Sequence, residues 1–454
     1  MQTAHSSSRL RKNSAIWQEW EGHEFHSCRK CRLINGALAP EDSSWGSKHT
    51  FPQPAREDEC RVGHVSRRDF SPQPPSRTKL DGLANHHRKT GSSQLVFLLI
   101  FATLAAPVLL HSHVPISAES RDMAPTVRIG VLGLFHPRLL TVTAIAGQAL
   151  VVHAASEQLV LETSSGTDSA TLRLDHNSIT LIARSRTIHA ASVTITGRNT
   201  DPAGFLLSVP QKLTRHYRGT LEIRPSSGSL VAIVNMDRET AVASVLAAET
   251  TSDTTLEALK AEAIAIRSYF VAGRARHPEF DFCDTTHCQF LREPPPPTSP
   301  AAKAVTTTRG LVLAYDSQAF VAMYTRSCSG RTHTPAELHL PSSSYPYYSV
   351  ECPYCRAHPV RWTTRITRAA AAQLRPLDEP ARLNVVRRLG WASVPSNDFT
   401  ETQDGDSFIL SGVGQGHGIG LCQSGAKSMA RHGATFQQIL ARYYPNTTIV
   451  AWPQ

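Results

Sequence analysis

The sequence predicts an α+β protein in which a small β-rich module precedes a domain that mixes helices with antiparallel strands. Residues 125–210 consist of short β-branched runs broken by Gly, Ser, Asp and Asn, a pattern typical of strands. After about Tyr217, strand-like runs alternate with amphipathic stretches that predict helices. We therefore place the β-rich module at residues 119–212 and the mixed domain at residues 213–454.

The first two helices of the mixed domain are predicted from their end signals. Asp237 is a suitable N-cap for a helix that runs to about Ala248. Thr254-x-x-Glu257 has the form of a capping box that opens the next helix, and Gly273 ends that helix. Apolar residues at helical spacing predict that one face of each helix is buried.

Proline, glycine and capping signals predict the remaining elements. Residues 292–300 contain REPPPPTSP, which predicts a loop because proline continues neither a helix nor a central strand. The runs GLVLAYD and AFVAMYTRS predict a strand pair, and a glycine-rich turn then leads into a helix. Thr435-x-x-Gln438 is expected to cap the last helix.

The composition is that of a globular protein with a basic excess. The chain has 454 residues, enough for two or three domains, and a net charge of +10. This charge suits an anionic partner such as nucleic acid, a membrane surface or a cell-wall polymer. Much of the excess lies in the first ninety residues, so it says little about the folded part.

The N-terminal region predicts export. Residues 1–90 are rich in Ser, Pro, Arg and His and predict a disordered basic tail. In residues 91–118, a basic flank, an apolar run and a small residue at Ala118 are typical of a signal peptide or an uncleaved N-terminal anchor. A signal so far from the N-terminus indicates a mis-assigned start nearer Leu80; the alternative is a genuine cytoplasmic tail. Either way we expect export to the cell envelope, periplasm or extracellular space.

A cluster of metal-ligand residues follows the second predicted helix. Its members are His277, Cys283, His287 and Cys288. Zinc favours four tetrahedral nitrogen and sulfur ligands, and a Cys2His2 set closes that shell, so the predicted site is structural. The alternative is a Cys283–Cys288 disulfide, which suits an exported protein.

Four further cysteines follow the first cluster. Cys352-Pro-Tyr-Cys355 has the form of a redox pair or of half a zinc site, and Cys328 and Cys422 flank it. No thioredoxin-like pattern surrounds the pair, which argues against redox catalysis. Two disulfides or a second zinc site both remain open, and we favour the disulfides. A metal site that includes His333 or His358 is a further alternative.

Several separate segments of the mixed domain resemble one known family. They are VNMDRETAVASVLAAETTSDTTLEALKAEAIAIRSYF, DFCDTTHCQF, TRSCSGRTHT and GQGHGIGLCQSGA. In this order they resemble the SpoIID/LytB family, which comprises stage II sporulation protein D and amidase-enhancer proteins. Family members with known activity are lytic transglycosylases that cut peptidoglycan. The resemblance covers roughly Tyr217 to the C-terminus.

The resemblance implies roles for individual residues. Glu249 aligns with the catalytic glutamate, and the His/Cys cluster aligns with the zinc ligands. Arg267 and Tyr269 match a segment expected to line the cleft, and His417 and Gln423 are expected to reach the glycan. By themselves, Asp253, Glu257 and Glu262 are interpreted as exposed turn and helix charges. Where the family reads S-E-M-P, this chain reads A-E-T-T at residues 248–251.

The implied reaction is cleavage of the MurNAc–GlcNAc bond of peptide-free glycan strands with a 1,6-anhydro product. A single glutamate serves as both acid and base, whereas a hydrolase normally needs two carboxylates. Glycan strands and a cell-wall amidase are the implied partners, with membrane contact only through the N-terminal segment. The glycine-rich run fits neither a dinucleotide fingerprint nor a P-loop, and we expect no nucleic-acid partner.

Two alternatives remain open. The first is a non-catalytic wall-binding protein that enhances an N-acetylmuramoyl-L-alanine amidase. The second is a metal-dependent wall hydrolase, which would need an open metal position that a four-ligand set lacks.

Overall fold

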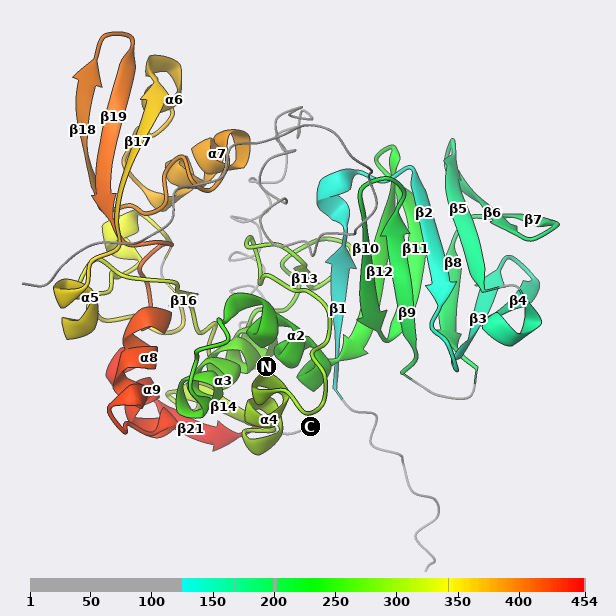
Figure 1. Cartoon of the computed structure of the whole chain (residues 1–454), viewed down its shortest axis with the longest axis horizontal. Helices are drawn as coiled ribbons and strands as arrows, with labels where there is room; N and C mark the ends of the chain where they lie inside the picture. Colours follow the sequence, from blue (N-terminus) through cyan, green and yellow to red (C-terminus); the bar gives the residue numbers. More distant parts are fainter. Residues whose placement is uncertain (1–124, 167, 199–201, 342, 453–454) are drawn as a thin grey trace, which may run out of the picture. The chain divides into compact units, whose positions relative to one another are not determined.

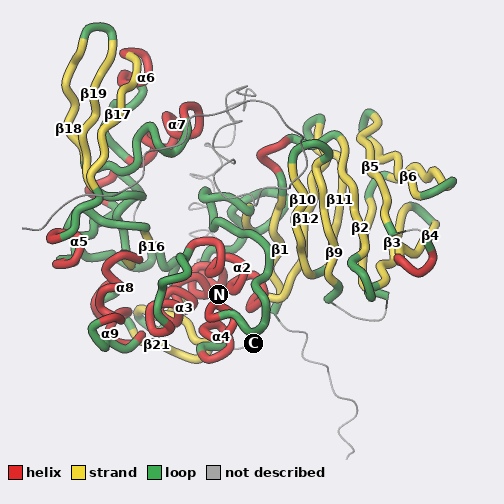
Figure 2. Tube along the Cα trace, viewed as in Figure 1, coloured by secondary structure: helices red, strands yellow, loops and turns green. Residues whose placement is uncertain are grey.

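The computed structural model describes residues 125–452, except residues 167, 199–201 and 342 (Figures 1 and 2). Strands and helices are both abundant, and the predicted α+β class is confirmed. The predicted tail at 1–90 and the predicted export segment at 91–118 lie outside the described residues. Among the residues that are described, none of the helices has the length and apolar character needed to span a membrane.

The β-rich part is built from a seven-stranded and a six-stranded sheet. In spatial order, the first sheet contains β13 (Phe282–Cys283), β1 (Thr126–Val131), β12 (Ser229–Asp237), β11 (Thr220–Ser226), β8 (Val193–Gly197), β3 (Ala149–Ala154) and β4 (Glu157–Glu162). The second contains β10 (Leu213–Arg218), β9 (Gly204–Val209), β2 (Leu139–Ala144), β5 (Ser169–Asp175), β6 (Ser178–Ala183) and β7 (Arg186–Ala190).

Alternating side chains from both sheets form a shared hydrophobic core. In β2, Leu140 and Val142 are fully buried, and in β3 the same holds for Leu150 and Val152. Strand residues two apart point to the same face, so a period-two apolar pattern buries one face of each sheet. The strand character predicted for residues 125–210 follows from this pattern.

The predicted boundary between residues 212 and 213 does not fall at the edge of a sheet. β10 begins at Leu213 and pairs with β9, and β11 pairs with β8 through Leu221 and Ile195. The sheets therefore continue to Asp237, where the first helix begins. The sequence signal changes near Tyr217, but strand pairing across that point depends on contacts between distant residues.

Two helices follow the last long strand. α2 (Arg238–Glu249) begins as predicted at Asp237, whose carboxylate accepts a hydrogen bond from the Thr240 amide at 2.9 Å. α3 (Leu256–Ala272) ends at Gly273, also as predicted. The predicted capping box is wrong, because Thr255 is the N-cap. The Glu257 carboxylate instead accepts hydrogen bonds from Lys260 at 2.6 Å and from the Phe436 amide at 2.9 Å.

The remaining elements surround α3 or extend from that region. The helices are α4 (Pro300–Thr307), α5 (Pro353–Ala357), α6 (Arg368–Ala372), α7 (Glu379–Leu389), α8 (Gln423–Arg431) and α9 (Phe436–Tyr443). The strands are β14 (Leu311–Tyr315), β15 (Gln318–Ala319), β16 (Tyr324–Thr325), β17 (Arg361–Thr367), β18 (Phe399–Asp404), β19 (Ser407–Val413), β20 (Leu421–Cys422) and β21 (Thr448–Ala451). Short 3-10 turns are Gly133–Phe135, Thr163–Ser165 and Ala336–Leu338.

Some of these elements differ from the prediction. The expected strand pair is a short hairpin of β14 and β15, and the chain then separates to form β16, which pairs in parallel with β20. The capping box of Thr435 and Gln438 at α9 is confirmed.

α3 is the central helix of the mixed region. It contacts α2, α4, α8, α9 and β14, and Figure 1 shows these elements around it. Residues on nearly all of its faces are buried, which is typical of a helix inside a core.

A buried ion pair joins α2 to α3. The guanidinium of Arg267 donates two hydrogen bonds to the Glu239 carboxylate, at 2.8 and 2.6 Å. The Arg267 side chain has no exposed surface. A bidentate contact satisfies both charged groups where water does not reach them.

Replacing Glu239 by alanine should lower the free energy of unfolding by about 3–5 kcal/mol, because the Arg267 charge would remain buried without its partner. Urea unfolding of the full chain measures this. The control is Glu162→Ala, which removes an exposed ion pair with Arg198 and should cost no more than about 1 kcal/mol. Equal losses in the two variants would contradict a buried, stabilising pair.

Candidate active site

A pocket lies beside the C-terminus of α2. Two carboxyl groups, Glu249 and Glu262, line it together with the side chain of Gln423. The other lining residues are Thr250, Thr251, Thr254, Ala258, Arg326, Ser424, Ala426 and Lys427. They come from the end of α2, from α3, from the loop after β16 and from α8. Distant parts of the sequence therefore meet at the predicted catalytic glutamate.

Glu249 is the last residue of α2 and is partly buried. Burial raises the pKa of its carboxyl group to about 7, while the Phe290 backbone amide, Arg326 and Arg292 act in the opposite direction. A carboxyl group with a pKa near 7 holds a proton for much of the time at neutral pH. It can therefore act as a general acid, and its conjugate base can accept a proton.

Glu262 is a pocket residue that the sequence interpretation missed. It was expected to be a solvated helix charge, but only 2% of it is exposed. Gln423 donates a hydrogen bond to its carboxyl oxygen at 2.6 Å. Burial raises the pKa of Glu262 to about 8; the Gln423 hydrogen bond lowers it, and the charge of Glu249 raises it further. Its position in the sequence could have indicated burial, since Glu262 lies at helical spacing from the apolar Leu259 and Ile266.

The two threonines after Glu249 hold the turn that follows the acid. Thr250 donates its hydroxyl hydrogen to the Leu246 carbonyl oxygen at 2.6 Å. Lys427 reaches across from α8 to the hydroxyl of Thr251 at 2.8 Å and to the Asp253 carboxylate at 2.6 Å. Side-chain hydrogen bonds thus hold this turn, where the family pattern has methionine and proline.

Arg326 connects the walls of the pocket. Its guanidinium donates to the backbone carbonyl oxygen of Glu249 at 2.8 Å. Its own carbonyl oxygen accepts hydrogen bonds from the amide and the hydroxyl of Ser424, at 3.2 and 3.0 Å. The end of α2, the loop after β16 and the start of α8 are therefore joined through one residue.

The predicted ligand cluster is assembled in the structure. One ligand atom from each of His277, Cys283, His287 and Cys288 lies within 4.8 Å of the others. His277 Nε2 lies 3.2 Å from Cys288 Sγ, and His287 Nδ1 lies 3.7 Å from Cys283 Sγ. Cys283 and Cys288 are free thiols, so the disulfide alternative is not found. Two imidazoles and two thiols in this arrangement could hold a metal ion.

The β-rich part and the cluster together position the loop beside Glu249. β13, which contains Cys283, pairs in parallel with β1. The buried Asp284 accepts hydrogen bonds from the Leu132 amide at 3.1 Å and from Arg215 at 3.0 Å. The same loop continues to Phe290, whose backbone amide stabilises the charged form of Glu249 and so lowers its pKa.

Arg267 and Tyr269 do not line this pocket. Arg267 is fully buried against Glu239, which leaves no surface for a glycan and corrects the expected role in binding. Tyr269 is also buried and packs against the Phe282 ring, with a centroid distance of 6.0 Å. The guanidinium of Arg276 lies 5.4 Å from the Tyr269 ring centroid. Tyr269 therefore supports the metal-ligand loop.

The two residues of the glycine-rich segment that were expected to reach the glycan lie in different places. Gln423 lines the pocket, whereas His417 is absent from its lining. Burial lowers the pKa of His417 to about 4, against the opposing effect of Glu379. Gly420 has a φ of +72°, and a Cβ there would lie 1.9 Å from the Met323 carbonyl oxygen. This position therefore requires glycine, and the close approach brings β20 against the chain before β16.

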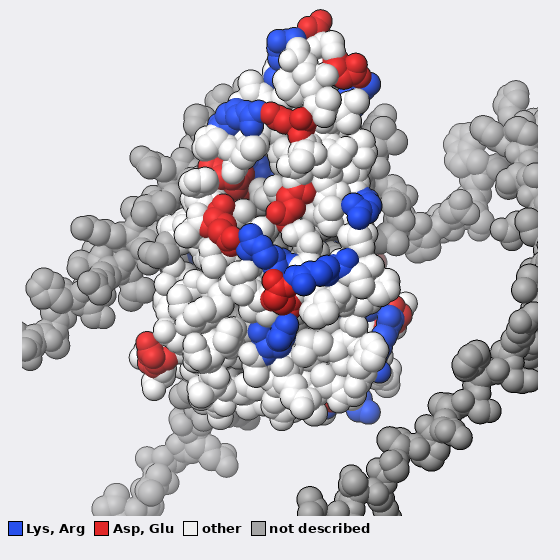
Figure 3. All heavy atoms as spheres, turned by 90° about the vertical axis from the view of Figure 1, so that its left-hand side faces the viewer, with Lys and Arg blue, Asp and Glu red and all other residues white. Residues whose placement is uncertain are grey.

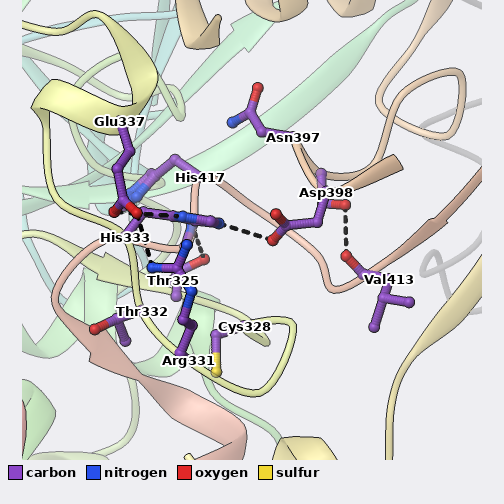
Figure 4. Close-up of polar contacts among 12 residues, drawn as sticks. Thr325, Cys328, Arg331, Thr332, His333, Glu337, Asn397, Asp398, Val413 and His417 are labelled. Atoms are coloured by element: carbon purple, nitrogen blue, oxygen red, sulfur yellow. Dashed lines mark hydrogen bonds and ion pairs between the residues drawn. The ribbon is translucent and has the colours of Figure 1, made fainter. Parts of the chain in front are cut away.

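The two histidines considered as further metal ligands, His333 and His358, contact other residues. His333 Nε2 lies 2.8 Å from the Asp398 carboxylate, and Glu337 approaches the other ring nitrogen (Figure 4). His358 contacts the Tyr354 carbonyl oxygen at 3.2 Å. The disulfides expected among Cys328, Cys352, Cys355 and Cys422 are not found, since all four are free thiols. Their sulfur atoms converge on one point instead of forming pairs.

Comparisons with known proteins show which family this region resembles. Residues 226–315 match the family model SpoIID, described as Stage II sporulation protein. That span contains α2, α3, Glu249 and the His277–Cys288 cluster. This part of the chain is therefore similar to the SpoIID family.

Individual proteins are similar to longer or shorter parts of the chain. Stage II sporulation protein D of Bacillus subtilis is 26% identical over 264 residues, 48% of this chain and 76% of that protein. An uncharacterized protein of Brachyspira hyodysenteriae is 27% identical over 268 residues, 52% of this chain and 72% of that protein. The Bacillus subtilis protein named amidase enhancer is 39% identical over 64 residues, 14% of this chain and 9% of that protein.

Replacing Glu262 by glutamine should stabilise the protein increasingly as pH rises. The folded-state pKa of about 8 exceeds the value of about 4.3 expected for an unfolded chain. Between these values the folded state retains a proton that the unfolded state has released, so wild-type stability falls as pH rises through that window. Glutamine avoids this loss, and its amide oxygen can still accept the Gln423 hydrogen bond.

Unfolding free energies between pH 4 and pH 9 measure the effect. The advantage of Glu262→Gln should be near zero at pH 4 and reach about 5 kcal/mol at pH 9. Glu162→Gln, an exposed control, should follow the wild type throughout. An advantage independent of pH would show that Glu262 does not retain its proton.

Proposed function

We propose that this protein is a peptidoglycan lytic transglycosylase. Similarity to the SpoIID family and to proteins named stage II sporulation protein D and amidase enhancer supports a role at the cell wall. The observation that carries the more specific proposal is the Glu249 carboxyl group, whose pKa burial raises to about 7 at the edge of a pocket. Such a group can donate a proton and then recover one within a single catalytic cycle.

The reaction needs one acid/base group. Glu249 donates its proton to the glycosidic oxygen as the bond from that oxygen to C1 of N-acetylmuramic acid breaks. The departing N-acetylglucosamine keeps this proton as its 4-hydroxyl hydrogen. The Glu249 carboxylate then accepts the proton of the C6 hydroxyl, whose oxygen bonds to C1 and closes the 1,6-anhydro ring. The enzyme is left in its starting protonation state.

The state of Glu262 favours this reaction over hydrolysis. A hydrolase normally pairs its acid with an ionised carboxylate that acts as nucleophile or activates water. Glu262 is the other carboxyl group of the pocket, but burial raises its pKa to about 8 and keeps it neutral at pH 7. Its hydrogen bond from Gln423 also occupies one carboxyl oxygen. Glu262 then positions Gln423, and Glu249 performs both proton transfers.

The proposed substrate is a glycan strand without peptide stems. Lys427 and Arg431 near the pocket are paired with Asp253, each at 2.6 Å. Figure 3 shows basic and acidic groups interspersed on one face of the molecule. Without peptide stems, such a strand carries one lactate carboxylate on each N-acetylmuramic acid, and this sparse charge suits a surface of mixed sign better than a dense polyanion does. An amidase that removes the peptide stems would act first, and the relative named amidase enhancer makes such a partner plausible.

We also propose that His277, Cys283, His287 and Cys288 hold a zinc ion with a structural role. Four protein ligands close the tetrahedral shell and leave no position for a reacting water. The ion would hold the loop that presents Phe290 to Glu249. All of this chemistry belongs outside the cytoplasm, so we propose that the chain is exported.

Replacing Glu249 by glutamine should abolish product formation, with a loss of at least about 100-fold, because the amide cannot donate or accept the required proton. Peptide-free glycan strands are incubated with wild type, Glu249→Gln and the exposed control Glu162→Gln, and the products are identified by mass spectrometry. Anhydro-muramic ends should appear with wild type and Glu162→Gln alone.

The enhancer alternative predicts a different result. The wild-type protein would then leave the strands intact and would sediment with them. The wild type and Glu249→Gln would increase the rate of a cell-wall amidase equally. Active wild type together with fully active Glu249→Gln would contradict the assignment of the acid. The relative named amidase enhancer is the observation that favours testing this alternative.

A further inference from the structure

We propose that Cys328, Cys352, Cys355 and Cys422 bind a zinc ion through four thiolates, at a site separate from the His277–Cys288 cluster. The four sulfur atoms all lie within 4.8 Å of one another. Each cysteine is buried, with at most 2% of its surface exposed. None lies within residues 226–315, the span matched by the family model. The proposal does not depend on the proposed catalytic activity.

The sulfur geometry fits a shared metal ion better than disulfides. Cys355 Sγ and Cys422 Sγ are 3.5 Å apart, whereas a disulfide requires about 2.0 Å. Zinc–sulfur bonds of about 2.3 Å in a tetrahedron place the sulfur atoms about 3.8 Å apart. The observed separation is close to that value, and the four atoms form one group. Soft thiolate sets of this kind select zinc over hard cations.

The polar groups around the sulfur atoms also suit bound thiolates. The Cys328 backbone amide donates a hydrogen bond to Cys422 Sγ at 3.3 Å. The hydroxyl groups of Tyr443 and Ser327 lie 3.4 Å from Cys352 Sγ and 3.6 Å from Cys355 Sγ, within range to donate. Hydrogen bonds to ligand sulfur atoms stabilise their negative charge and orient them.

Three distant segments supply the ligands. Cys352 and Cys355 lie at the start of α5 in a C-x-x-C turn, the spacing by which many zinc sites obtain two ligands from one loop. Cys328 follows β16, and Cys422 ends β20, its parallel partner. The packing is close, since a Cβ at Gly425 would lie 2.6 Å from Cys352 Sγ. A single ion would join segments that local structure does not hold together.

The site would position the pocket wall opposite Glu249. Cys422 directly precedes Gln423, which is hydrogen-bonded to Glu262. Cys328 is two residues after Arg326, which donates to the Glu249 carbonyl oxygen. The ion would therefore anchor Gln423, which contacts Glu262, and Arg326, which contacts the backbone of Glu249.

Metal content of the purified full chain tests the proposal. Elemental mass spectrometry should find one zinc ion fewer per chain in Cys352→Ser/Cys355→Ser than in the wild type. Cys283→Ser/Cys288→Ser should lose the other zinc and retain this one. The matched control, Cys28→Ser/Cys31→Ser/Cys60→Ser, should keep the wild-type content. If the first cluster holds no zinc, wild type should contain one ion, which Cys352→Ser/Cys355→Ser alone removes.

A second measurement needs no altered protein. Wild type reconstituted with cobalt(II) should show the intense sulfur-to-metal absorption of a tetrathiolate site, and peptide mapping without reduction should find all four cysteines as thiols. Disulfides among these four residues, or zinc content unchanged in Cys352→Ser/Cys355→Ser, would overturn the proposal. Iron in place of zinc would overturn the assignment of the metal.

Discussion

The structure depends on α3, a helix buried on nearly all faces that nevertheless carries an arginine and a glutamate. Burial of a charge is costly unless a partner satisfies it. Arg267 is satisfied by the carboxylate of Glu239, which fixes α3 against α2. Glu262 is satisfied by retaining its proton and by a hydrogen bond from Gln423, which fixes α3 against α8. The exclusion of water that makes these buried charges unfavourable also raises the pKa of Glu249.

The walls around Glu249 are held from two sides. On one side, Asp284 and the pairing of β13 with β1 anchor the loop that brings the Phe290 amide to the acid. On the other side, the four-cysteine cluster lies at the base of the segments that carry Arg326 and Gln423. The strands that lead into these walls are short, because β13, β16 and β20 contain only two residues each. Hydrogen bonds, together with the metal ions that we propose, would supply the rigidity that the proposed acid catalysis requires.

The sequence predicted the α+β class, the start of α2 at Asp237 and the end of α3 at Gly273 because these features depend on local residues. It also predicted that the His277–Cys288 cluster comes together, because close spacing limits the possible arrangements. Its errors concern contacts between distant residues. The sheets extend past residue 212 because β10 and β11 find partners earlier in the chain. Glu262 was assigned to the surface and Arg267 to the cleft, since the residues that cover them are distant in sequence; Gln423, for example, lies 161 positions from Glu262. The convergence of four cysteines from three segments also depends on contacts between distant residues.

The central claim is that water exclusion keeps Glu249 protonated near neutral pH. Carbon-13 NMR of glutamate carboxyl groups, with the Glu249 signal assigned by its loss in Glu249→Gln, measures this directly. The account predicts a titration midpoint at a pKa of about 7. A midpoint near the ordinary pKa of about 4.3 would contradict it, because an ionised Glu249 has no proton to donate.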